Sequence, residues 1–241
     1  MRVLCIGAHI DECEYGVGGV STILIEKGHT VRWLNPATYL HVKDERRAEM
    51  RAQSDAAAQV IGAEKITWPN EQHDKTWVCD KENIMKIQQE IESFKPDIMF
   101  IQWPKDNHPE HAHVALASYY AISNALSVKI HEIYAYEAGL NQTSDYFVPD
   151  FTIEISGVFD RVGDSLRCYA TTNANGDELV MEKRIQAQFR ARQNGQKLSE
   201  VFRIVKYPDG GDDFYLREIA GDCFRWCGCR QYPGLGREYF I

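Results

Sequence analysis

The chain has 241 residues, of which 44% are hydrophobic and 26% are charged, and its formal net charge is −8 at pH 7. This composition is typical of a soluble globular protein with a sizeable core. The acidic balance argues against a nucleic-acid partner, and no apolar run is long enough to span a membrane. The N-terminus shows no signal-peptide pattern, so we expect a cytoplasmic protein.

Apolar runs and amphipathic stretches alternate along the first part of the chain. Strands are predicted at residues 3–6, 31–34, 65–68, 97–101 and 131–136. Helices are predicted at residues 17–27, 43–61, 81–94 and 109–126. This alternation predicts an α/β fold: a Rossmann-like, doubly wound, mostly parallel sheet of the 3-2-1-4-5 type, with helices on both faces.

The C-terminal third is less regular. Strands are expected at 148–155 and 201–205, and helices at 158–169 and 178–194. We therefore expect one domain over residues 1–205 and an extension over residues 206–241. The aromatic-rich sequence of the extension favours packing on the domain or a contact between copies in a homo-oligomer.

The seven cysteines are expected to be thiols in a cytoplasmic protein. Three of them cluster as Cys223, Cys227 and Cys229. This cluster lacks a fourth ligand at the usual zinc spacing, which favours surface thiols over a metal site.

One imidazole and three carboxylates follow the first predicted strand, at His9, Asp11, Glu12 and Glu14. Burying several carboxylates together is unfavourable unless a positive charge lies among them. A metal cation is the simplest candidate, and a solvated acidic loop is the alternative.

A second cluster, with three histidines and two carboxylates, follows the fourth predicted strand between Asp106 and His113. If a helix begins at Pro109, His108 and His111 can face the strand ends, whereas His113 points elsewhere. Ligands of doubly wound sheets bind where the strand order reverses, which for this order lies between the first and fourth strands.

The two clusters should therefore meet in one crevice. His9, Glu12 and His111 would then supply two imidazoles and a carboxylate, a set typical of catalytic zinc with an open position.

These residues also resemble a known family. The stretch from Gly7 to Gly19 is similar to the A-H-P-D-D-x-E-x-G-x-G-G signature of the LmbE-like, or PIG-L, zinc-dependent de-N-acetylases. His-Pro-Glu-His at residues 108–111 resembles the H-P-D-H motif of that family. Weaker similarity extends over most of the chain.

The resemblance implies a role for each matching position. His9, Glu12 and His111 match the ligands of one zinc ion per chain. Asp11 matches the general base and His108 matches the residue that stabilises the oxyanion. Glu110 matches an aspartate that supports the histidine at the position of His108.

Three positions depart from the family pattern: Ile10 replaces proline, and Glu12 and Glu110 replace aspartates. We expect the extra methylene of Glu12 to shift the metal or to alter its affinity. The implied activity is removal of an N-acetyl group from an N-acetylglucosamine-type glycoconjugate, which releases acetate and a free amine without an organic cofactor.

Other readings stay open at this point. They are a zinc amidase for a bulkier amide, such as a thiol conjugate or an antibiotic, and a family member that binds metal but turns over weakly or not at all. A nucleotide-binding module is a third, although the glycines at 16, 18 and 19 lack the G-x-G-x-x-G spacing. For a small amino-sugar substrate, Arg47 or Arg51 is a candidate for holding an anionic group, and Asn70 for contacting hydroxyls.

Overall fold

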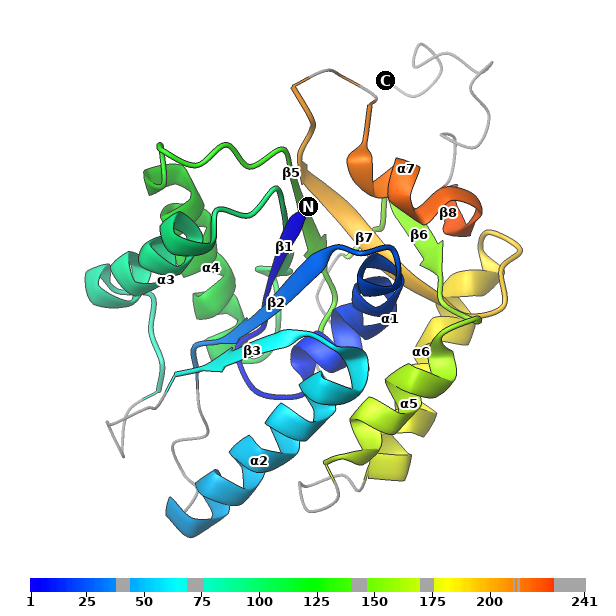
Figure 1. The fold of residues 1–241 in the computed structure, drawn as a ribbon, viewed down its shortest axis with the longest axis horizontal. Coiled ribbons are helices and arrows are strands. Elements are labelled where there is room, and N and C mark those ends of the chain that lie inside the picture. The colour runs from blue at the N-terminus through cyan, green and yellow to red at the C-terminus, as the bar shows by residue number, and fades with distance from the viewer. Residues whose placement is uncertain are drawn as a thin grey trace.

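The computed structural model describes residues 1–37, 44–68, 76–139, 147–169, 176–209, 211 and 213–227. Within these residues, one sheet runs through the molecule in the order β3-β2-β1-β4-β5-β7-β6-β8 (Figure 1). The strands are β1 (Arg2–Ile6), β2 (Thr30–Asn35), β3 (Glu64–Thr67), β4 (Ile98–Gln102), β5 (Glu132–Tyr136), β6 (Phe151–Glu154), β7 (Ser199–Lys206) and β8 (Phe224–Trp226).

The predicted strand order is confirmed. All four pairings among β1 to β5 are parallel, in the order 3-2-1-4-5. The C-terminal strands then extend the same sheet, because β7 pairs antiparallel with β5, and β6 lies antiparallel between β7 and β8.

The central strands are buried on both faces. In β1, Val3 and Cys5 belong to one hydrophobic cluster, whereas Leu4 and Ile6 belong to the other. Successive side chains of a strand point to opposite faces, so a strand covered on both sides is apolar throughout. This is why β1 and β4 are recognisable as continuous apolar runs.

Helices cover both faces of the sheet, as predicted (Figure 1). The helices are α1 (Glu12–Glu26), α2 (Asp44–Ile61), α3 (Lys81–Phe94), α4 (Pro109–Asn124), α5 (Phe159–Arg167), α6 (Gly176–Arg192) and α7 (Tyr215–Ala220). Buried residues of α3 and α4 pack in one cluster, and those of α1, α5 and α6 pack in the other. None of the described helices is both long and apolar enough to cross a bilayer.

Helix α1 begins at Glu12, five residues before the start predicted from apolar periodicity. The first turn contains the buried carboxylates of Glu12 and Glu14, which interrupt the apolar periodicity on which the prediction was based. Further along, the carboxylate of Glu200 accepts hydrogen bonds from the backbone N–H groups of Gly19 and Val20, each at 2.8 Å. Lys183 Nζ lies 3.0 Å from Glu200 Oε1. Glu200 of β7 therefore links α1 to α6 through hydrogen bonds and an ion pair.

The described part of the predicted extension packs on the domain. Buried Glu132 accepts hydrogen bonds from the backbone N–H groups of Tyr215 and Leu216 at the start of α7. The ring of Phe224 stacks on Phe151 with centroids 4.7 Å apart. The six cysteines among the described residues are free thiols, and Cys229 lies outside them.

Candidate metal centre

The two histidine–carboxylate clusters meet at the carboxyl ends of β1 and β4. His9 Nε2 lies 2.7 Å from Glu110 Oε2, and Glu12 Oε1 lies 2.5 Å from His111 Nε2. Each contact joins the segment after β1 to the first turn of α4. The two clusters therefore meet where the order of the strands predicts, beyond the ends of β1 and β4.

The backbone of the first segment is fixed by side chains of neighbouring strands. Asn35 Nδ2, at the end of β2, donates to the carbonyl oxygens of Gly7 and His9. The hydroxyl of Tyr136 donates to the carbonyl of Ile6 at 2.9 Å. Asp11 then takes a left-handed conformation, with φ of 88°, immediately before α1. This conformation is one that aspartate and asparagine tolerate better than most residues.

Glu12 is the hub of the cluster. Its Oε1 lies 2.8 Å from His9 Nδ1 and 2.5 Å from His111 Nε2. Its Oε2 accepts hydrogen bonds from the backbone N–H of His9 at 3.0 Å and from Gln102 Nε2 at 2.6 Å. Burial alone raises the pKa of a carboxyl, but the charges of His111 and His9 outweigh it and hold the pKa of Glu12 well below its usual value.

The three imidazoles differ in their protonation. Burial lowers the pKa of His9 and His111, but the Glu12 carboxylate outweighs this and raises the pKa of His9 to about 9 and that of His111 to about 10. In contrast, burial and the two neighbouring histidines lower the pKa of His108. Its ring stacks on His111 with centroids 4.5 Å apart. Without a cation, therefore, His108 is neutral at neutral pH.

The donors fit a divalent cation. His9, His108 and His111 each offer one nitrogen, and these atoms lie within 4.8 Å of one another. Both ring nitrogens of His111 are buried without a hydrogen bond of good geometry, although carboxylate oxygens lie close by. Imidazole and carboxylate donors together suit zinc.

The position of Glu12 is compatible with such an ion after a small movement. Two ligands of a tetrahedral zinc ion are about 3.3 Å apart, given metal–ligand bonds of about 2.0–2.1 Å. Glu12 Oε1 is closer than that to both His9 and His111. A cation would therefore move this oxygen by less than about 1 Å.

Asp11 lies in an acidic environment. Burial, followed by the nearby charges of Glu12 and Glu14, raises the pKa of Asp11 to about 8. Glu14 is fully buried and is held by Lys65 Nζ at 2.9 Å and by the hydroxyl of Tyr169 at 2.7 Å. A carboxyl group with such a pKa can take up and release a proton near neutral pH.

The remaining predicted residues are placed as follows. Glu110 bonds to His9 and to the backbone N–H of Trp77, rather than to His108. Arg51 is half-buried on α2, and its Nε atom is buried without a hydrogen-bond partner. Asn70 lies outside the described residues.

The structure also adds residues that the sequence analysis did not select. Gln102 ends β4, and its Oε1 accepts from the backbone N–H of Ala8 at 2.9 Å while its Nε2 donates to Glu12. Asp106 Oδ2 lies 3.2 Å from His111 Nδ1. Asp106 was visible as one of the two carboxylates in the second cluster, but Gln102 carries no such signal because its role depends on the strand pairing.

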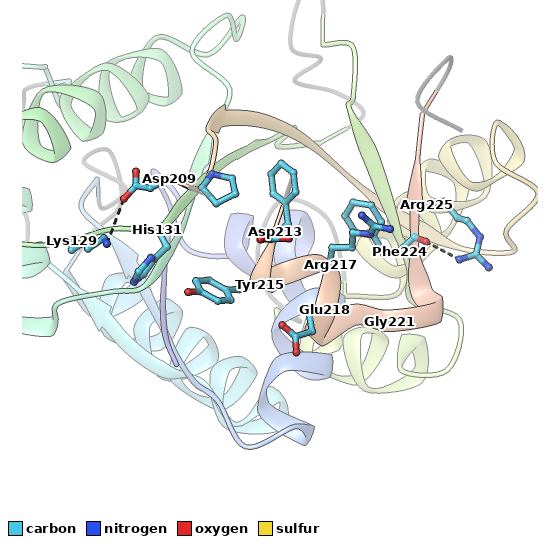
Figure 2. Close-up of a pocket in the computed structure, with 12 residues that line it drawn as sticks. Lys129, His131, Asp209, Asp213, Tyr215, Arg217, Glu218, Gly221, Phe224 and Arg225 are labelled. Atoms are coloured by element: carbon cyan, nitrogen blue, oxygen red, sulfur yellow. Dashed lines mark hydrogen bonds and ion pairs between the residues drawn. The ribbon is translucent and has the colours of Figure 1, made fainter. Parts of the chain in front are cut away.

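A separate pocket of about 840 Å³ lies at the opposite end of the parallel strands (Figure 2). Its lining includes Lys129 and His131, which precede β5, and Tyr215 and Arg217 of α7. The wall carries both cations and carboxylates, and Lys129 lies 3.5 Å from Asp209. This pocket shares no residue with the histidine cluster.

The fold and the cluster define a doubly wound α/β protein with a candidate metal centre at its switch point. Residues 4–122 match the model of the PIG-L family, described as GlcNAc-PI de-N-acetylase. The resemblance noted in the sequence is thereby confirmed.

Solved structures with the same fold cover most of the chain. The N,N′-diacetylchitobiose deacetylase of Pyrococcus horikoshii is 20% identical, with a TM-score of 0.72, over 85% of this chain and 83% of that protein. The 4-carboxy-2-hydroxymuconate hydratase GalB of Pseudomonas putida KT2440 is 16% identical, with a TM-score of 0.71, over 85% and 96%. A zinc-inhibited form of the teicoplanin deacetylase Orf2 is 14% identical, with a TM-score of 0.62, over 84% and 97%. Since these proteins include deacetylases and a hydratase, the shared fold does not decide the reaction.

Proposed function

We propose that this chain is a zinc-dependent N-deacetylase that hydrolyses the acetamide of an N-acetylglucosamine-type glycoconjugate. The observation that carries the proposal is the convergence of His9, Glu12 and His111 at the switch point of a chain that matches the PIG-L family model. In this proposal these three residues hold one zinc ion. Bound zinc would act as a Lewis acid that polarises the amide carbonyl and makes water a better nucleophile at neutral pH.

Asp11 is the proposed general base. It takes a proton from the attacking water as the new carbon–oxygen bond forms. The same proton can then pass to the amine nitrogen as the carbon–nitrogen bond breaks, which gives acetate and a free amine. Burial raises the pKa of Asp11 toward neutral pH, where a carboxyl group can both take up and release a proton.

His108 is the proposed partner of the oxyanion. Its lowered pKa favours the neutral ring, which still carries one N–H that can donate a hydrogen bond. Its Nδ1 is buried without a hydrogen-bond partner, so the ring has a free polar atom beside the cluster. Donors aimed at a developing oxyanion are a large source of rate acceleration.

We propose a small-molecule amino sugar, with the Arg51 guanidinium on α2 and Asn70 as substrate contacts. A bulkier amide, such as that of an antibiotic, is the second candidate, because teicoplanin deacetylases share the fold. Release of free amine from a panel of N-acetylglucosaminides and larger N-acyl compounds separates the two.

The test of the proposal measures metal content and turnover together. The wild-type protein should hold one zinc per chain and release acetate from an N-acetylglucosaminide. His9→Ala and His111→Ala should lose the metal and the activity. His113→Ala is the matched control, since His113 lies on α4 outside the cluster and accepts from the backbone N–H of Cys79. Full zinc retention in both ligand variants would contradict the assignment, and zinc without turnover on any substrate would indicate a binding protein.

A further inference from the structure

The carboxylate of Glu110 contacts two segments that are distant in the sequence, one at His9 and one at Trp77. Oε2 lies 2.7 Å from His9 Nε2, and Oε1 accepts the backbone N–H of Trp77 at 2.7 Å. Trp77 is 6% exposed and packs in the cluster beneath α3 and α4. Both carboxylate oxygens are therefore fixed by groups that are themselves buried.

The contact at His9 has a consequence for metal binding. An imidazole that binds a metal through one nitrogen carries its proton on the other, and a carboxylate that accepts this proton fixes the tautomer and the ring orientation. Glu110 contacts Nε2 of His9, whereas Nδ1 of His9 contacts Oε1 of Glu12, the same oxygen that contacts Nε2 of His111. The proton of a neutral His9 then lies on Nε2, and the Nδ1 lone pair faces the other donors.

We infer that Glu110 is a positioning residue for His9, which holds Nδ1 ready for the metal, and that it does not act through His108. The inference rests on the proposed zinc site. It differs from the role that the family resemblance implies, where the residue at this position supports the histidine that corresponds to His108.

The length of the side chain explains the difference. An aspartate at position 110 would withdraw its carboxylate by about 1.5 Å, the length of one carbon–carbon bond. The distance to His9 Nε2 would then approach about 4 Å, which is beyond hydrogen-bond range. The glutamate in this chain reaches His9 and Trp77 at the same time.

The neighbouring residue His113 provides a matched control. It also lies on α4 and also accepts a backbone N–H from the segment before α3, that of Cys79 at 3.3 Å. It touches none of the proposed metal ligands through a described hydrogen bond or ion pair. Removing His113 therefore loosens the same segment without releasing His9.

The experiment measures the zinc dissociation constant by competition with a chelator for wild type, Glu110→Ala, Glu110→Asp and His113→Ala. The absorption spectrum of the cobalt-loaded proteins reports the ligand geometry, and thermal unfolding of the metal-free proteins shows that each variant is folded. Partners of ligating histidines typically contribute about 10–100-fold to metal affinity. We expect a loss of this size in both Glu110 variants, with an altered cobalt spectrum, and wild-type affinity in His113→Ala.

The outcomes distinguish this inference from the proposed function. Tight zinc binding by wild type and by both Glu110 variants would overturn the inference alone. An equal loss of affinity in His113→Ala would also overturn it, since it would assign the effect to the segment. A wild-type protein without measurable zinc affinity would overturn the proposed function and the inference together.

Discussion

Asp11 combines an uncommon backbone conformation with a strongly shifted carboxyl group. Asparagine is the substitution that tests its chemistry most cleanly, because asparagine tolerates the left-handed region and has nearly the same shape. Asp11→Asn cannot accept the proton of water. We expect it to keep zinc and to lose about 10²–10⁴-fold in kcat. A near-normal kcat, measured with confirmed zinc content, would place the base elsewhere.

The same substitution should change the pH dependence of stability in the metal-free protein. A carboxyl whose pKa rises from about 3.9 to about 8 on folding binds protons more tightly in the folded state, so its contribution to stability is lost as pH rises through that window. Asparagine does not titrate. With zinc removed by a chelator, the Tm of Asp11→Asn should rise relative to the Tm of wild type as the pH increases from 5 to 9. A constant Tm difference would show that Asp11 is not buried as a neutral acid.

Glu12 is longer than the aspartate of the family pattern, and we expect the metal site to require this length. Its two oxygens contact His9, His111 and Gln102 together. Glu12→Asp would withdraw the carboxylate from these partners, so we expect zinc affinity to fall by about 10–100-fold. Tighter zinc binding with higher turnover in Glu12→Asp would instead show that the glutamate weakens the metal site.

At the scale of elements, the close approach of α1 to the sheet depends on glycine. A Cβ at Gly19 would lie 2.4 Å from Cγ2 of Ile155, whereas one at Gly18 would lie 3.4 Å from Cγ1 of Val162. Overpacking of this kind typically costs about 1–3 kcal/mol. We expect Gly19→Ala to lower the free energy of unfolding by that amount, as measured by denaturant titration.

Gly18→Ala is the matched control for this prediction. The new methyl group has room, and alanine stabilises a helix interior by roughly 0.5–1 kcal/mol relative to glycine. The control should therefore be neutral or slightly stabilising. Equal destabilisation by the two substitutions would mean that the loss comes from the helix itself and not from the contact of Gly19 with Ile155.

The elements that could be predicted from the sequence are those whose pattern is set locally. Helix α3 has the predicted bounds because an amphipathic pattern follows the N-cap Asp80, whose side chain accepts from the backbone N–H of Asn83. Helix α7 and strand β8 were not predicted. Each is short, and β8 exists only because it pairs with β6 and packs its aromatic ring on Phe151.

At the scale of the whole molecule, the meeting of the two clusters was predictable because the strand order alone brings the ends of β1 and β4 together. The partners within the site were not. Whether the carboxylate at position 110 reaches His9 depends on the length of its side chain, and the contact of Gln102 with Glu12 depends on the register of β4. Sequence spacing does not encode distances at this scale.

The C-terminal region should unfold together with the rest of the chain. Phe214, Leu216 and Phe224 belong to the same hydrophobic cluster as Val3 of β1 and as helix α1. Phe224→Ala removes a ring that is 6% exposed, and burial of this kind typically contributes about 3–5 kcal/mol. We expect this loss in denaturant unfolding, with one transition that coincides by tryptophan fluorescence and by circular dichroism.

Phe189→Ala is the control for this prediction, because it also replaces phenylalanine by alanine but at a position on α6 where the side chain is 59% exposed. Its cost should be below about 1 kcal/mol, since exposed side chains rarely contribute more. If Phe224→Ala split the unfolding into two transitions, the region after β7 would be a separate cooperative unit. A single transition at a lower denaturant concentration would instead show that α7 and β8 belong to the same cooperative core as α1. Helix α1 begins with Glu12, so this core also supports the candidate metal centre.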